Sequence, residues 1–219
     1  MNPTPLAGFN EVTEALVRLA TLVGAAMRKA TGALLDSDLH TAESVIDADA
    51  DIDTLTSEIE GQCLDLLSAG RLEESDLRAV IGALRMAASL ERMGDLAEHV
   101  AKQARLRYPR SSIPEEVRNI FTRMGELAEQ IVTKTATIIH TRDVDLTAEI
   151  GREDTEVDKL HRDLFTIVLS PTWTHGVEAA IDVTLLSRYY ERYADHAVSV
   201  TRRVITIVTG EPYVAVSLD

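Results

Sequence analysis

Residues 79–104, AVIGALRMAASLERMGDLAEHVAKQA, decide the fold of this chain. Within them, small and apolar side chains recur in alternating steps of four and three residues, the spacing that places them on one face of an α-helix. The segment follows an acidic start at residues 73–76 and ends before Tyr108-Pro109, a dipeptide that favours helix termination. The sequence therefore predicts a long amphipathic helix that buries one stripe: Ala79, Ala83, Met86, Leu90, Met93, Ala97, Val100 and Ala104.

Two stripes of the same kind precede this helix. They occupy residues 9–34 and residues 45–63, and the second is expected to end near Gly70. Between them, the segment 36–38 interrupts the apolar pattern with Asp, Ser and Asp, which are typical of a helix start. The three stripes together predict a three-helix unit, followed by a short linker over residues 110–114.

The same three stripes return in the second half of the chain. Val12 recurs as Val117, 105 residues later, and Ala79 recurs as Ala179, 100 residues later. A repeat of about 100 residues is large enough for a folded unit. The sequence thus predicts an all-α protein with two tandem repeats of an antiparallel three-helix bundle, six long helices in all, over residues 1–110 and 111–219.

The composition excludes several classes of protein. The 219 residues carry a net charge of −14, which disfavours a nucleic-acid module and suits a protein that binds cations or a basic partner. Cys63 is the only cysteine, which excludes a disulfide framework and a cysteine-based zinc cluster. We see no signal-peptide pattern and no apolar run near the ~20 residues of a membrane span. We therefore expect a cytoplasmic protein without direct membrane insertion.

A pair of carboxylates lies outside the apolar stripe on the third helix of each repeat. Glu91 and Asp95 are four residues apart, and Glu191 and Asp195 repeat this pair. Side chains at i and i+4 leave a helix on the same face, about 5–6 Å apart at Cβ, where like charges repel. The sequence places no Lys or Arg on that face between the two acids, and both pairs are expected to face outward. A metal cation would relieve the repulsion.

The second helix of each repeat carries a matching pair of acids. Asp49 and Asp53 recur as Asp154 and Asp158. Two pairs on neighbouring helices would form a site of oxygen ligands, which suits iron, manganese, magnesium or calcium better than zinc. A solvated acidic face is the other interpretation, because charged residues ordinarily occupy the polar side of a helix. The predicted metal ligands are Asp49, Asp53, Glu91, Asp95, Asp154, Asp158, Glu191 and Asp195.

Other candidate sites are weaker. His99 and His196 lie near the acid pairs, as possible ligands or as surface histidines. Only Asp158-x-x-His161 comes near the Glu-x-x-His spacing of ferritin-like sites. A basic patch near the second acid pair, which includes Arg192 and Arg203, could meet an acidic partner or phosphate, or pair with neighbouring acids. A carboxylate-bridged metal-dependent enzyme remains the alternative function, but no base or nucleophile recurs in both repeats, so no catalytic or cofactor-binding residue is predicted.

Residues 91–97 and 190–197 resemble the duplicated Glu/Asp-x-x-x-Asp signature of the PhoU family of bacterial phosphate-signalling regulators. The acids at Asp49 and Asp154 resemble the start of the family's second pair of signatures, and the resemblance extends from Phe9 to Glu211. It implies two bundles packed side by side, with clusters of iron, manganese or zinc on an acidic surface.

The resemblance also implies a function without catalysis. A member of this family is expected to be a cytoplasmic protein, often a homodimer, that links the ATP-binding subunit of the Pst phosphate ABC transporter to a PhoR-type sensor histidine kinase. It would repress phosphate uptake and the phosphate-starvation genes when phosphate is plentiful. Many members carry Asn four residues after the signature Asp, where this chain has His99 and Ser199, and this difference leaves the number and identity of the metal ions open.

Overall fold

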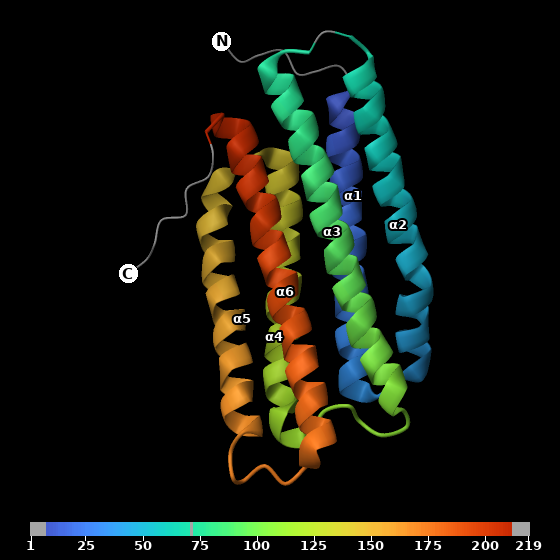
Figure 1. Cartoon of the computed structure of the whole chain (residues 1–219), viewed down its shortest axis with the longest axis vertical. Helices are drawn as coiled ribbons and strands as arrows, with labels where there is room; N and C mark the ends of the chain where they lie inside the picture. The colour runs from blue at the N-terminus through green and yellow to red at the C-terminus, as the bar shows by residue number, and fades with distance from the viewer. Residues whose placement is uncertain (1–7, 71, 212–219) are drawn as a thin grey trace.

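The computed structural model describes residues 8–70 and 72–211, which form six long α-helices and one short 3₁₀ helix (Figure 1). This confirms the all-α fold class. The outer limits of the two predicted repeats, at residues 1 and 219, lie outside the described residues. The elements are α1 (Phe9–Asp36), α2 (Leu39–Ser68), α3 (Glu74–Arg107), α4 (Glu115–Thr141), η1 (Val144–Leu146), α5 (Thr147–Val168) and α6 (Gly176–Thr209).

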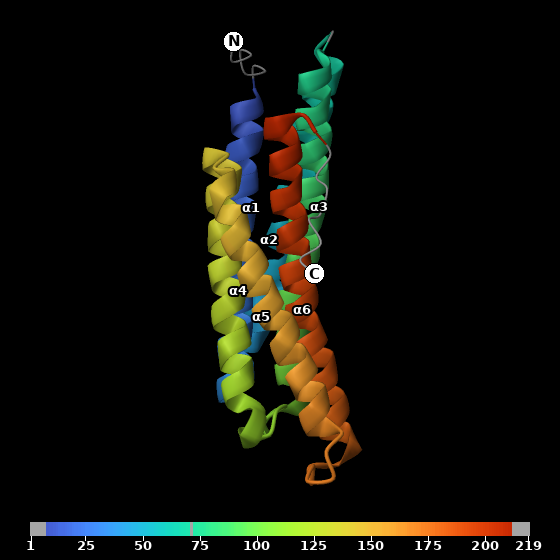
Figure 2. The ribbon, with the colours of Figure 1, turned by 90° about the vertical axis from the view of Figure 1, so that its left-hand side faces the viewer.

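The helices form two antiparallel three-helix bundles that lie side by side (Figures 1 and 2). Helix α1 packs against α4, and α3 packs against α6, so these four helices form the centre of the molecule. Helix α2 covers the groove between α1 and α3, and α5 covers the groove between α4 and α6. Within the described ranges, every helix is too polar or too short to cross a lipid bilayer.

One helix boundary shows how the sequence directs the turns. Ser37 ends α1 in the left-handed conformation, with φ of 53°, and the Asp38 carboxylate then accepts a hydrogen bond from the Thr41 backbone N–H at 3.1 Å. This bond satisfies one of the free N–H groups at the start of α2. The interruption predicted at residues 36–38 is therefore the turn between the first two helices.

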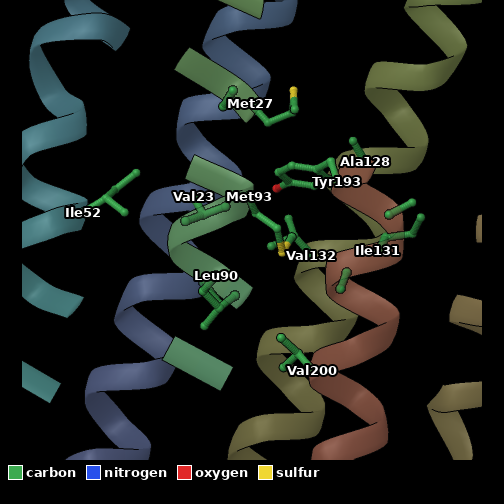
Figure 3. Close-up of a cluster of buried hydrophobic side chains, with 14 of the residues drawn as sticks. Val23, Met27, Ile52, Leu90, Met93, Ala128, Ile131, Val132, Tyr193 and Val200 are labelled. Atoms are coloured by element: carbon green, nitrogen blue, oxygen red, sulfur yellow. The ribbon is translucent and has the colours of Figure 1, made fainter. Parts of the chain in front are cut away.

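The hydrophobic core is continuous between the two repeats. In Figure 3, Val23 of α1, Met93 of α3, Val132 of α4 and Tyr193 of α6 all meet in one cluster. The predicted stripe of α3 is buried from Ala83 to Ala104, while Ala79 is partly buried, and Leu90, Met93 and Ala97 are fully inaccessible to solvent. Apolar burial of this kind is the main stabilising contribution in a helical bundle, so the repeats stabilise one another.

Glycines allow α1 and α4 to approach closely. A Cβ atom on Gly24 would lie 2.9 Å from Val132 Cγ1, and a Cβ atom on Gly125 would lie 2.5 Å from Thr31 Cγ2. Each helix thus presents a glycine to a β-branched side chain of the other. A Cβ atom at either position would force the facing Val132 or Thr31 side chain to move.

Two fully buried tyrosines on α6 differ in how their hydroxyl groups are satisfied. The Tyr190 hydroxyl lies 2.7 Å from Thr31 Oγ1, which itself donates to the Met27 carbonyl, so the tyrosine is the donor. The Tyr193 hydroxyl has no hydrogen-bond partner among the described residues, and burial raises its pKa. A buried polar group without a partner destabilises the folded state.

We expect Tyr193→Phe to leave the free energy of unfolding unchanged or to raise it by up to about 1 kcal/mol, because the change removes an unpaired buried hydroxyl. Tyr190→Phe is the matched control and should lower it by about 1 kcal/mol, because a made hydrogen bond is lost. Urea unfolding followed by circular dichroism measures both. An equal decrease in the free energy of unfolding of the two variants would contradict the assignment of the Tyr193 hydroxyl as unpaired.

Candidate functional site

The structure brings the eight predicted acids together as two clusters, one in each repeat. We call them the first acidic cluster (Asp49, Asp53, Glu91 and Asp95, from α2 and α3) and the second acidic cluster (Asp154, Asp158, Glu191 and Asp195, from α5 and α6). Burial and the charges of Glu98, Asp53 and Asp95 raise the pKa of Asp49 to about 6.

The second acidic cluster shows the same electrostatic behaviour. Burial, followed by the charges of Asp158, Asp195 and Glu191, raises the pKa of Asp154 to about 6. The charge of Arg202 acts in the opposite direction. The acids of each cluster are therefore close enough to repel one another, as the sequence predicted for neighbouring helices.

A small residue inside the signature sets the distance between α2 and α3. A Cβ atom on Gly94 would lie 3.0 Å from Ile52 Cδ1 and 3.6 Å from Asp49 Oδ1. The second repeat has Ala194 at this position, where it is also buried. The fourth residue of the signature must be small because the neighbouring helix packs directly on it.

Most of the acids are less exposed than the sequence suggested. The Glu91 and Asp95 side chains are 27% and 29% exposed, and the Glu191 side chain is only 13% exposed. Of the four acids on α3 and α6 that we expected to face outward, Asp195 alone is exposed, and Asp53 on α2 is exposed as well. The other acids lie in the grooves that α2 and α5 cover, because the edge of each buried stripe, and not the opposite face, carries the signature.

The prediction that no cation neutralises the pairs on α3 and α6 was wrong. Arg92 places Nη1 2.7 Å from Asp95 Oδ2 and Nε 4.0 Å from Glu91 Oε2. Arg188 forms an ion pair with Glu191, three residues away. An arginine side chain is long enough to reach an acid three residues away on its own helix. The sequence analysis assigned each side chain to one face of the helix and so did not account for this reach. Each cluster still has more carboxylates than arginines: Arg92 pairs with acids of the first, and Arg188 and the charge of Arg202 act on acids of the second.

The donor set suits a hard cation, although the side chains are not arranged as ligands. Carboxylate oxygens are the ligands that such cations prefer, and Glu191 Oε2 is buried without a hydrogen-bond partner. Within residues 8–70 and 72–211, however, no three His, Cys, Asp or Glu side chains converge on a position for one metal ion. Binding would require these side chains to rotate and would require Arg92 and Arg188 to release their acids.

The two histidines beside the clusters have other contacts. His99 Nδ1 lies 2.5 Å from the backbone carbonyl of Asp95, and its ring packs against Tyr189 with ring centroids 5.3 Å apart. Burial, the largest effect, lowers the pKa of His196, which lines the contact between α3 and α6. Among the described residues, neither histidine joins two acids in a group that could hold a metal ion.

A serine and histidine pair that the sequence analysis missed lies beside the second acidic cluster. His161 Nδ1 is 2.8 Å from Ser187 Oγ, and the Ser187 hydroxyl donates to the Thr184 carbonyl at 3.0 Å. The histidine is therefore the donor, the reverse of a base that activates a nucleophile. The spacing Asp158-x-x-His161 marked the histidine, but no sequence signal connected it to Ser187.

The comparison with known families agrees with this geometry. Two segments of the chain, residues 16–104 and 121–204, match the sequence profile of the PhoU domain, and they contain all eight acids. The chain belongs to the PhoU family. The resemblance seen in residues 91–97 and 190–197 is thereby confirmed.

Relatives and solved structures of the PhoU family cover nearly all of the chain. The phosphate-specific transport system accessory protein PhoU homolog 2 of Mycobacterium tuberculosis (strain ATCC 25618 / H37Rv) is 46% identical over 202 residues, which is 92% of this chain and 95% of the relative. PhoU homolog 1 of Mycobacterium leprae is 44% identical over 92% of this chain and 91% of its own length.

The crystal structure of the phosphate transport system regulatory protein PhoU from Streptococcus pneumoniae superposes with a TM-score of 0.84 at 25% identity, covering 94% of this chain and 98% of that one. The PhoU structure from Pseudomonas aeruginosa gives 0.82 at 25% identity, covering 94% and 99%.

We expect Asp154→Asn to stabilise the metal-free protein at neutral pH by about 1 kcal/mol, after allowance for solvent screening. The ionised Asp154 destabilises the folded state because its pKa is about 6 there, against 3.8 for the unfolded chain. The folded state binds the extra proton between these values, so this destabilisation grows as the pH rises from about 4 to about 6. The increase in the free energy of unfolding of the Asp154→Asn variant should therefore reach its full size above pH 6 and vanish below pH 4.

Urea unfolding in the presence of a chelator, repeated across this pH range, measures the effect. Asp163→Asn, at an exposed position on the same helix, is the control and should show no such dependence. A gain that persists at pH 4 would show that repulsion between charges is not its cause.

Proposed function

We propose that this PhoU protein represses high-affinity phosphate uptake and the phosphate-starvation genes by linking the Pst phosphate ABC transporter to a PhoR-type sensor histidine kinase. Its mycobacterial relatives, which are named accessory proteins of a phosphate-specific transport system, support the connection to phosphate transport. One structural observation carries the rest of the proposal. Each repeat gathers four carboxylates from two neighbouring helices, and burial, followed by the charges of the neighbouring acids, raises the pKa of Asp49 in the first cluster and of Asp154 in the second.

In this proposal, the two acidic clusters hold metal ions: iron, manganese or zinc, with magnesium as a further candidate. The first cluster would offer the carboxylates of Asp49, Asp53, Glu91 and Asp95, and the second those of Asp154, Asp158, Glu191 and Asp195. A bound metal supplies positive charge that removes the repulsion between these acids. The clusters flank the central α3/α6 pair, so metal loading would change the charge on both sides of it by several units. A change of that size alters the electrostatic complementarity to a partner surface.

The proposed role is binding and not catalysis. The partners would be the ATP-binding subunit of the transporter and the sensor kinase, which places the protein in the cytoplasm, and we expect it to act as a homodimer. The donor direction between His161 and Ser187 gives no support to the alternative of a metal-dependent enzyme.

We expect the double variant Glu191→Ala and Asp195→Ala to lose the metal of the second acidic cluster and to release the starvation genes at high phosphate. The two acids leave the second cluster with too few ligands, while the first cluster remains complete. Metal analysis of protein purified without chelator, together with a starvation-gene reporter, measures both effects.

The control is the double variant Glu58→Ala and Asp163→Ala, which removes two exposed acids outside the clusters. Equal metal content in the wild type and the cluster variant would reject the metal sites. Loss of metal with unchanged repression would instead reject their regulatory role.

A further inference from the structure

A groove of about 310 Å³ lies between the start of α3 and the end of α6. Leu77 and Ile81 of α3 line it and are 40% and 47% exposed. Ile207 of α6 completes the apolar floor and packs on Gly82, where an added Cβ atom would lie 2.6 Å from Ile207 Cδ1. Exposed apolar side chains that gather in a hollow favour contact with another apolar surface.

Three arginines surround this apolar floor. Arg78 forms an ion pair with Glu74 at 2.7 Å. Arg85 and Arg203 also line the groove, and neither side chain forms an ion pair or hydrogen bond with any residue that the structure describes. Among the described residues that line the groove, Glu74 is the only acid, so this lining is positive on a chain whose net charge is −14.

The positive charge of the groove is not repeated at the opposite end of the contact between α3 and α6. At the positions that correspond to Leu77 and Ile81, 100 residues later, Val177 and Ile181 are also exposed. Gly82, however, corresponds to Asp182, which is buried and pairs with Arg107 at 2.6 Å. The duplicated fold thus repeats the exposed apolar residues at both ends, but not the arginines: the counterparts of Arg78, Arg85 and Arg203 are Glu178, Leu185 and Gln103.

We propose that the groove between the start of α3 and the end of α6 docks an acidic amphipathic segment of a partner protein. The apolar side chains of that segment would contact Leu77, Ile81 and Ile207, and its carboxylates would pair with Arg85 and Arg203. Arg78 and Arg85 are two helical turns apart, about 10 Å along the axis, a spacing that acids on a partner helix can match. A long phosphate polymer would gain nothing from the apolar floor.

Selection of random peptides of about 14 residues, which span about 21 Å as a helix, tests the proposal on the purified full chain in chelator. The enriched peptides should be rich in Asp and Glu, with apolar residues at helical spacing. They should bind the Arg85→Glu and Arg203→Glu double variant about tenfold more weakly than the wild type, because two ion pairs become repulsions. If charge reversal lowers the melting temperature, the double variant Arg85→Gln and Arg203→Gln replaces it.

The chain offers matched controls for both parts of the groove. Ile81→Ser should weaken peptide binding, and Ile181→Ser at the opposite end should not. Charge reversal at Arg18 and Arg152, which are exposed on other helices, should have no effect. Enriched peptides without an acidic surplus, or equal binding to the wild type and the groove variants, would overturn the proposal.

Two other occupants would also overturn it. Inorganic polyphosphate is the first probe, and a dependence of its binding on Arg85 and Arg203, with no such dependence for peptides, would make this a phosphate site. Sedimentation is the second measurement. If the Arg85→Glu and Arg203→Glu variant sediments as a smaller species than the wild type, a second copy of the chain occupies the groove.

Discussion

Burial of one apolar stripe on α3 fixes the direction of every other side chain on that helix. Because successive residues turn by a constant angle around a helix, the burial of Leu90 and Met93 places Glu91 and Asp95 in the groove under α2. The same constraint places Arg85 and Arg92 along the contact with α6. Packing in the core therefore determines which charges face which neighbour, and α6 obeys the same rule in the second repeat.

The two acidic clusters destabilise the folded state. Carboxylates that are half-buried and close together raise one another's pKa, so the folded protein is less stable when they ionise. Arg92 and Arg188 offset part of this repulsion and leave a surplus of negative charge in each groove. A chain selected only for stability would place fewer acids there, which is why the clusters are the strongest candidates for function.

The sequence predicted the features that depend on periodicity. The buried stripes and the break at residues 36–38 follow from helical spacing, and the structure contains them. The side-by-side packing of the bundles came from the family resemblance, because each stripe indicates that a helix is buried but not which helix buries it. The ion pairs of Arg92 and Arg188 were missed because they depend on side-chain rotamers, which periodicity does not determine. The pair of His161 and Ser187 joins two helices at a point where neither residue belongs to a repeated pattern.

Duplication has preserved the core of the two repeats more closely than the surfaces between them. Leu90 and Met93 correspond to Tyr190 and Tyr193, all buried, so the central helices keep their packing while the side chains change. At the ends of the α3/α6 contact, by contrast, an apolar contact on Gly82 corresponds to the ion pair of Asp182. The approximate symmetry of the fold is thus broken by charge. One end of the contact between α3 and α6 thus presents arginines around an apolar floor, and the other presents the ion pairs of Arg107 with Glu178 and Asp182.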